Sequence, residues 1–163
     1  MKKFLFRTGI ITAGIVLLIF VIKLFIGFFG EINQYKKMEA RVEKIIDGDT
    51  LVISGGQKVR LLGIDTPELH HPDRPVQKYA KEAKEYLEKR VKGKNCTFEY
   101  NINEKFDKYG RLLAYVYVDK ELVNSELVKK GYAYVYEKDD NRKTKEFLML
   151  ENVARRLKKG VWE

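Results

Sequence analysis

Cysteine and histidine are almost missing from this sequence, and their scarcity limits the metal chemistry open to the protein. Cys96 is the single cysteine, which excludes an intramolecular disulfide framework and any cysteine-rich zinc site. The two histidines, His70 and His71, are adjacent, and neighbouring side chains in one loop rarely chelate a metal together. Any bound metal must therefore be held by carboxylates, which favours calcium or magnesium over zinc. Cys96 itself is expected to be a small core residue in a strand.

Length and composition exclude several other protein classes. The 163 residues suit one domain, and 45% hydrophobic with 34% charged residues is not the composition of a disordered, collagen-like or fully membrane-embedded protein. The net charge of +9 favours a polyanionic partner, either nucleic acid or an acidic membrane surface. The first thirty residues hold +4 of this charge, so the remainder of the chain is only moderately basic.

The stretch from Thr8 to Gly30 is apolar and carries one charge, Lys23. About 20 apolar residues span a bilayer, so we expect a transmembrane helix within an N-terminal segment of residues 1–30. Its bulky exit lacks the small-residue cleavage site of a signal peptide, which favours an uncleaved anchor. We expect the N-terminus in the cytoplasm and the rest of the chain outside the cell, secreted if the segment is cleaved. Residues 31–40 are expected to be a linker or a short helical extension.

From Arg41 onward the pattern of apolar residues predicts short strands separated by helices. Five strands are expected, at residues 41–46, 50–53, 58–64, 95–100 and 112–118. Helices are expected along the apolar face from Val76 to Val91, from Glu121 to Lys130 and from Lys143 to Lys159. This arrangement predicts an α+β domain at residues 41–163, in which helices pack on a small closed or partly open barrel.

Three short segments carry the residues suited to chemistry: 46–50, 60–68 and 107–111. Taken singly, each can be an ordinary turn or a helix entry. Together they supply two carboxylates at strand ends, Asp49 and Asp65, which can converge on a hard cation if their strands are neighbours. Glu68 adds a third acid, and Arg60 and Arg111 can grip a phosphate bidentately. The combination favours metal-assisted phosphodiester hydrolysis.

The segments D-G-D-T, R-L-L-G-I-D-T-P-E and D-K-Y-G-R, in this order, resemble the thermonuclease (staphylococcal-nuclease-like) family. The resemblance runs from about Arg41 to Trp162. It implies a five-stranded Greek-key OB-fold barrel with three helices. It also implies a calcium-dependent nuclease that cleaves DNA and RNA to 3′-phosphate products. The expected partners are these nucleic acids and, through the N-terminal helix, the membrane; a monomer is expected.

The resemblance also implies a role for each residue of the three segments. Asp49 and Asp65 would bind Ca²⁺ through their carboxylates and Thr66 through its backbone carbonyl. Asp47 would lie next to these ligands without binding the ion itself. Glu68 would be the general base or orient the attacking water.

Arg60 and Arg111 would bind the scissile phosphate and stabilise the charge of the transition state. Lys108 and Tyr109 would contact a neighbouring phosphate. Tyr134 and Tyr136 would line the nucleotide pocket, although the stretch between Gly131 and Tyr134 is shorter than the family pattern.

Two other classes of function remain alternatives to a nuclease. One is a non-catalytic OB-fold module that binds single-stranded nucleic acid and is tethered to the membrane. The other is a membrane-tethered interaction protein that uses the barrel as a scaffold. The complete set of acids and arginines favours the enzyme, because binding alone needs no acids facing a phosphate.

Overall fold

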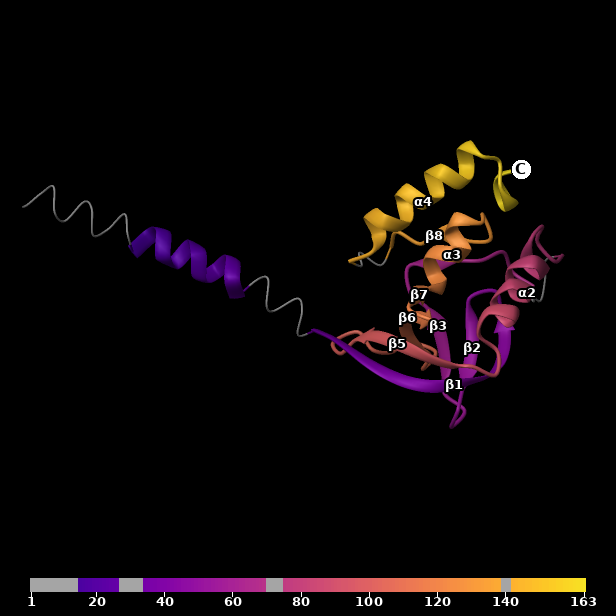
Figure 1. Ribbon diagram of the computed structural model, residues 1–163, viewed down its shortest axis with the longest axis horizontal. Helices are drawn as coiled ribbons and strands as arrows, with labels where there is room; N and C mark the ends of the chain where they lie inside the picture. The colour runs from indigo at the N-terminus through magenta and orange to yellow at the C-terminus, as the bar shows by residue number, and fades with distance from the viewer. Residues whose placement is uncertain (1–14, 27–33, 70–74, 139–141) are drawn as a thin grey trace, which may run out of the picture. The chain divides into compact units, whose positions relative to one another are not determined.

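The computed structural model describes residues 15–26, 34–69, 75–138 and 142–163. The chain divides into two compact units, residues 1–35 and 36–163 (Figure 1). In the first unit, residues 15–26 form a helix whose apolar side chains are exposed. Among the described residues, no helix combines the length and the apolar character needed to cross a membrane. The remainder of the expected span from Thr8 to Gly30 lies outside the described residues, as do His70 and His71.

The second unit is built on a closed barrel of five strands, which confirms the predicted α+β barrel. The sheet order is β3-β2-β1-β5-β6-β7, and an additional parallel pairing of β3 with β6 closes the barrel. The strands are β1 (Tyr35–Asp47), β2 (Thr50–Ile53), β3 (Lys58–Leu61), β4 (Ile64–Asp65), β5 (Asn95–Asn101), β6 (Leu112–Val118), β7 (Glu121–Leu122) and β8 (Tyr134–Val135).

The first strand is longer than the sequence pattern predicts. β1 begins at Tyr35, so residues 35–40 belong to a strand and not to the expected linker or helical extension. The Lys37 Nζ atom lies 5.8 Å from the centre of the Tyr117 ring, which ties the early part of β1 to the barrel. The irregular alternation in this stretch concealed the strand, because its side chains are largely exposed or half-buried.

The third predicted strand is divided in two by a turn at Leu62 and Gly63. Gly63 has a φ of 76°, a value that favours glycine. β3 therefore stays in the barrel, while β4 leaves it and pairs antiparallel with β8, with Asp65 opposite Tyr134. Asp65, the second of the two predicted metal-binding carboxylates, therefore lies on β4, outside the barrel wall.

Three helices cover the barrel, as predicted: α2 (Ala80–Val91), α3 (Val123–Lys129) and α4 (Thr144–Arg156). Figure 1 shows α3 and α4 layered at one end of the barrel. The buried face of α2 consists of Ala80, Ala83, Leu87 and Val91.

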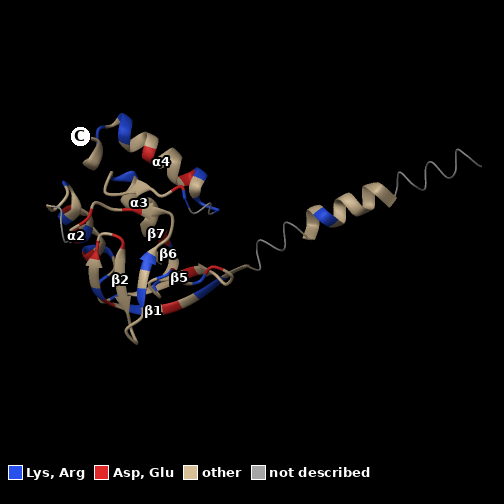
Figure 2. Cartoon of the chain, turned by 180° about the vertical axis from the view of Figure 1, so that it is seen from behind, with Lys and Arg blue, Asp and Glu red and all other residues tan. Residues whose placement is uncertain are grey.

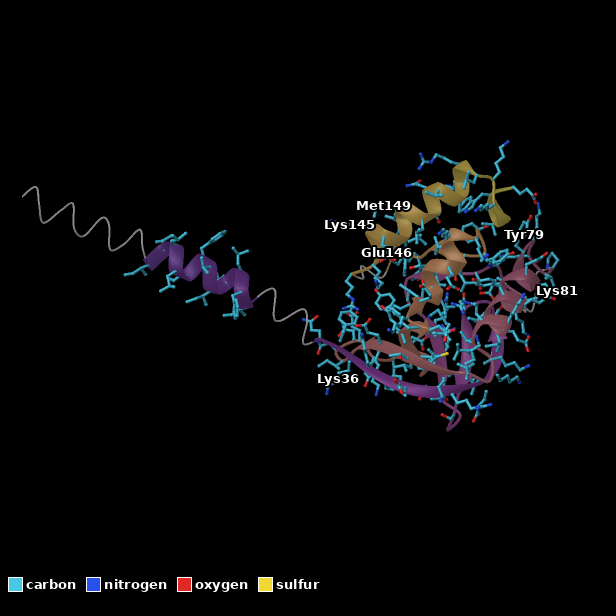
Figure 3. The ribbon with its side chains drawn as sticks, viewed as in Figure 1. Lys36, Tyr79, Lys81, Lys145, Glu146 and Met149 are labelled. Atoms are coloured by element: carbon cyan, nitrogen blue, oxygen red, sulfur yellow. The ribbon has the colours of Figure 1, made fainter. Side chains whose placement is uncertain are left out.

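Two apolar residues at the predicted helix ends do not pack inward. Val76 precedes α2 and is 61% exposed, because the helix begins only after Tyr79, which has a φ of 69° (labelled in Figure 3). Leu157 follows the last residue of α4 and is 58% exposed. Both corrections come from helix ends, where side-chain periodicity no longer describes the backbone.

Candidate active site

Asp49 is the buried centre of the candidate site and joins two distant segments of the chain. Its Oδ2 atom accepts hydrogen bonds from the backbone N–H and the hydroxyl of Thr66, both at 2.9 Å. Its Oδ1 atom accepts from the Thr50 hydroxyl at 3.0 Å. Its backbone carbonyl accepts from the Leu61 N–H at 2.9 Å, since β2 and β3 pair antiparallel. The carboxylate is therefore fixed between the β1–β2 turn and the residues after β4.

Gly48 allows this turn to approach its neighbours. A Cβ atom on Gly48 would lie 2.7 Å from the Thr66 Oγ1 atom and 2.8 Å from the Ala83 Cβ atom. The glycine of the D-G-D segment is thus required by close packing against Thr66 and α2. The same packing brings Asp49 within reach of Thr66.

The Arg60 guanidinium lies between the two predicted metal-binding carboxylates. Its Nη1 atom is 3.0 Å from Asp49 Oδ2, and its Nη2 atom donates to Asp65 Oδ1 at 2.7 Å. Nη1 also donates to the Ile64 carbonyl at 2.9 Å. The Arg60 side chain is only 14% exposed and the Asp49 side chain 9%, so their contact is shielded from water, whereas the Asp65 side chain is 48% exposed. The bonds together hold the guanidinium in one place.

Two carboxyl groups in this part of the structure have raised pKa values. Burial raises the pKa of Asp65, Arg60 opposes the rise, and the charges of Asp49 and Asp47 add to it. Burial and the charges of Asp47, Asp49 and Asp65 likewise raise the pKa of Glu68, again against Arg60. Four carboxylates therefore share one region with the Arg60 cation, and their mutual repulsion is only partly neutralised.

The backbone of Glu68 is held by Gln77, which lies just before α2. The Glu68 N–H donates to the Gln77 Oε1 atom at 2.9 Å, and the Gln77 N–H donates to the Glu68 carbonyl at 3.1 Å. These two bonds leave the Glu68 side chain exposed beside the acidic residues. The arrangement suits a carboxylate that must reach solvent and substrate.

Arg111 belongs to a separate turn that is held mainly by its own residues, with one added bond from the Gln57 Nε2 atom to the Gly110 carbonyl at 3.0 Å. Its Nε atom donates to Asp107 Oδ2 at 2.7 Å, and its backbone N–H donates to Asp107 Oδ1 at 2.9 Å. Burial raises the pKa of Asp107, but the hydrogen bonds from Arg111 and from the Tyr109 N–H outweigh it, and the pKa is lowered. The terminal nitrogens of Arg111 are not used by Asp107 and can meet a phosphate.

The β3–β6 pairing directs both arginines to the same side of the barrel wall. Arg60 is opposite Leu113 in the parallel register, and Arg111 lies two residues before Leu113. Side chains two residues apart in an extended chain share a face and are separated by about 6.6 Å along it. The flanking residues Leu61 and Leu112 point into the core.

The four predicted substrate-binding residues lie in two places. Lys108 and Tyr109 are exposed in the Arg111 turn, where the Lys108 Nζ atom is 5.0 Å and the Arg111 Cζ atom 5.4 Å from the centre of the Tyr109 ring. Tyr134 is opposite Asp65 in the β4–β8 pair, but its ring packs against Trp162, with centroids 5.1 Å apart. Tyr136 donates its N–H to the Gly63 carbonyl at 3.0 Å. The lysine and tyrosine of the turn therefore adjoin the predicted phosphate site, and Tyr134 uses its ring for packing.

Comparison with known proteins agrees with this geometry. Residues 58–163 match the family model described as staphylococcal nuclease homologue. The chain belongs to the staphylococcal nuclease family. It is 34% identical over 165 residues to a thermonuclease of Staphylococcus hyicus, covering 93% of this chain and 97% of that protein. It is 39% identical over 136 residues to endonuclease YncB of Bacillus subtilis (strain 168), covering 80% of this chain and 64% of that protein. The resemblance inferred from the three segments is confirmed.

In this staphylococcal nuclease family member, three residues have supporting roles that the sequence analysis did not assign. They are Gln77, Asn124 and Asp107, the last of which lies in one of the three predicted segments. Asn124 is fully buried; its Oδ1 atom accepts from the Val116 N–H at 3.0 Å and its Nδ2 atom donates to the Leu62 carbonyl at 2.9 Å. It thereby attaches the turn before β4 to β6. A signal existed only for Asp107, because an aspartate four residues before an arginine in a turn can cap the intervening N–H groups.

The residues around Asp65 fit a hard cation in charge and donor type. Within the described part of the chain, no three His, Cys, Asp or Glu side chains form a preformed metal cluster. The predicted set, however, contains only two carboxylates and one backbone carbonyl, from Asp49, Asp65 and Thr66. Calcium takes about six to eight oxygen ligands, so water and substrate would supply the others. Four carboxylates, those of Asp47, Asp49, Asp65 and Glu68, interact with the single Arg60 cation, so negative charge is in excess here, as a cation site requires.

Proposed function

We propose that the protein is a calcium-dependent nuclease that hydrolyses phosphodiester bonds of DNA and RNA and leaves 3′-phosphate ends. The observation that supports this most strongly is the placement of Arg60 between Asp49 and Asp65, with Arg111 on the same side of the wall. Membership of the staphylococcal nuclease family supports the reaction class. A simple binding module gains nothing from concentrating repelling carboxylates at a surface meant for phosphates.

Each side chain of the proposed site has its own role in hydrolysis. Glu68 is exposed beside the other acids, so its carboxylate would reach the attacking water and accept its proton. Arg60 and Arg111 would bind the scissile phosphate and stabilise the charge that develops on its oxygens, while the bond to the 5′-oxygen breaks. Asp49, Asp65 and the Thr66 carbonyl would hold Ca²⁺, which supplies Lewis-acid stabilisation of the phosphate when bound.

The metal requirement is tested with plasmid DNA and an RNA substrate in calcium, in magnesium and in excess chelator. Calcium should support cleavage of both, and magnesium should support it less well, because magnesium demands a tighter octahedral arrangement. Full activity in chelator would contradict the calcium proposal. Products that carry a 5′-phosphate instead of a 3′-phosphate would contradict the direction of cleavage.

Glu68→Gln separates a nuclease from a binding module. The substitution keeps the size of the side chain and removes the base, so turnover should fall about 10²–10⁴-fold while binding of substrate persists. Glu43→Gln is the matched control, because Glu43 is an exposed glutamate on β1 and should retain full activity. If Glu68→Gln stays folded and cleaves DNA like the parent, the proposed site is wrong and the binding module becomes the better interpretation.

We also propose that the nuclease domain is anchored by the N-terminal segment and faces outward. The apolar stretch from Thr8 to Gly30 and its exit without small residues support an uncleaved anchor. Fractionation combined with protease treatment of intact cells is the test. A mature protein in the medium that begins near Glu31 would show that the segment is a cleaved signal peptide.

A further inference from the structure

The sequence Lys-Lys-Gly occurs twice, at residues 129–131 and 158–160, and the fold brings the two copies together. The first ends α3 and the second follows α4. The Val161 N–H donates to the Gly131 carbonyl at 2.9 Å. A Cβ atom on Gly131 would lie 2.0 Å from the Lys159 carbonyl oxygen, and one on Gly160 would lie 2.1 Å from the Gly131 oxygen. The two backbones therefore cross in direct contact, which only glycine at both positions permits.

Five basic residues lie at this crossing or at the helix ends beside it, and we call them the dilysine surface. Its exposed members are Lys129, Lys130, Arg156, Lys158 and Lys159. Figure 2 shows basic residues at the end of α4, close to the C-terminus. No described carboxylate lies within ion-pair distance of any of these five side chains.

The neighbouring glutamates already have partners. Glu126 is bound by Arg90 and by the Tyr86 hydroxyl, both at 2.7 Å. Glu151 accepts from the Val135 N–H and from Arg155. Lys130 compensates part of its charge near Glu126, and its Nζ atom lies 5.0 Å from the centre of the Tyr86 ring. The other four basic residues of the dilysine surface form no ion pair with a described acid.

Compensation of helix dipoles does not account for all of this charge. A cation at a helix C-terminus contributes about 0.3–1 kcal/mol, and one lysine at each end would supply it. Bringing both pairs of lysines to one crossing adds mutual repulsion, which weakens a folded domain. A polyanion bound across the crossing would remove that repulsion.

Packed residues connect the dilysine surface with the candidate active site. The Trp162 N–H donates to the Lys159 carbonyl at 3.2 Å. The Trp162 ring lies against Tyr134, and Tyr134 is opposite Asp65 in the β4–β8 pair. The path of contacts from Lys159 to Asp65 thus passes through only two residues, Trp162 and Tyr134.

We propose that the dilysine surface binds phosphates of the nucleic acid strand that flank the cleavage site. This inference rests on the proposed nuclease function, since it assigns a second contact to the same substrate. Each phosphate that a lysine neutralises releases a counterion, so the surface should determine how cleavage of long substrates depends on salt. A dinucleotide is too short to reach beyond the catalytic residues, so its cleavage should not depend on the dilysine surface.

The test compares two triple variants of the full-length protein. The first is Lys129→Gln, Lys158→Gln and Lys159→Gln. The matched control is Lys36→Gln, Lys44→Gln and Lys89→Gln, which removes the same charge from exposed positions on β1 and α2. Figure 3 shows that Lys36 lies at the opposite end of the domain from the C-terminal helix. Thermal unfolding of both variants establishes that each is folded.

The measured quantity is kcat/KM against salt for single-stranded DNA of about 20 nucleotides and for a dinucleotide. For the long strand, the dilysine variant should lower kcat/KM about tenfold and flatten the slope of log kcat/KM against log salt by about 2, since each lost contact removes about 0.7. Its dinucleotide cleavage and both activities of the control should stay within about twofold of the parent. An unchanged slope with intact dinucleotide cleavage would overturn the inference.

Two further outcomes are decisive. If the parent cleaves neither substrate, the proposed nuclease function fails. The dilysine surface is then tested by equilibrium binding of the long strand, and the slope of log binding constant against log salt should flatten by the same amount in the dilysine variant. If the dilysine variant loses binding to phosphatidylglycerol vesicles while its slope on DNA is unchanged, the surface faces acidic lipid and the nucleic acid assignment is overturned.

Discussion

Asp49 and Arg60 are fixed by groups from several parts of the chain, whereas Arg111 is bound mainly by Asp107 in its own turn, to which Gln57 adds one bond from outside. The first cluster depends on the β1–β2 turn, on β3 and on Thr66. In the second, Asp107 alone binds the backbone and the side chain of Arg111. The pKa of Asp65 is raised in the first cluster and the pKa of Asp107 is lowered in the second. Function in the first cluster is therefore coupled to tertiary folding, and in the second it is nearly local.

The largest effects that test this comparison are expected from Arg60→Lys and Arg111→Lys. Each should lower kcat about 10²–10³-fold, because lysine offers a point charge and cannot reproduce a two-pronged contact to phosphate. Only Arg60→Lys should also lower the free energy of unfolding, by about 1–3 kcal/mol, since its partly buried bonds to Asp49, Asp65 and Ile64 are lost. Urea unfolding and steady-state kinetics measure both. Equal destabilisation by the two variants would show that Arg111 depends on tertiary contacts as much as Arg60 does.

A large loss of stability is expected from Asn124→Ala, far from any phosphate. The substitution leaves the Val116 N–H and the Leu62 carbonyl without partners in the core, at a cost of about 2–4 kcal/mol. Activity should fall as well, because the turn that precedes Asp65 loses its attachment to β6. Denaturant unfolding and kcat measured below the unfolding transition test this. The neighbouring partly buried Ser125→Ala is the control and should cost less.

A moderate effect is expected from Asp107→Asn. The amide can still accept the two backbone N–H bonds but loses the charged bond to Arg111 Nε, so activity should fall roughly 5–30-fold.

Stability in the same variant should depend on pH in a defined direction. The folded pKa of Asp107 lies below its ordinary value of 3.8, so its ionised form stabilises the protein above that pH, and this contribution disappears as the pH falls through the folded pKa. The parent and the variant should therefore differ in stability at neutral pH and converge in acid. A difference that persists at low pH would show that the charge of Asp107 is not the cause.

The smallest effect is expected from Gln77→Ala. Losing the side-chain bond to the Glu68 N–H should reduce kcat about fivefold and leave KM unchanged, because the base is less well placed while the arginines still bind phosphate. Gln77→Glu keeps an acceptor at this position and should restore most of the activity. A rise in KM with kcat unchanged would mean that Gln77 contributes to substrate binding and not to the position of Glu68.

Different parts of the fold were predictable to different degrees. The strands β2, β5 and β6 and the three helices carry regular apolar patterns, and their positions agree with the predictions to within a few residues. The early part of β1 was missed because its side chains are mostly exposed, so burial leaves no pattern there. The break at Gly63 was missed because the apolar run continues across it, while the backbone turns.

The sequence alone indicated the family and the kind of metal ligands to expect. Its few cysteines and histidines restrict a metal to oxygen ligands, and the order of D-G-D-T, R-L-L-G-I-D-T-P-E and D-K-Y-G-R is enough to indicate the family. The bonds between Asp107 and Arg111 are also readable, because they lie within five residues, whereas the bond from Gln57 to the Gly110 carbonyl is not.

Only the tertiary structure decided which groups meet. Arg60 lies between Asp49 and Asp65, Asn124 holds Leu62, and the two Lys-Lys-Gly segments cross, because strand pairing and close packing bring together residues that the sequence separates by up to 62 positions. The physical reason is that hydrogen bonds and contacts depend on distances of a few ångströms in space, which residue type and spacing along the chain do not determine.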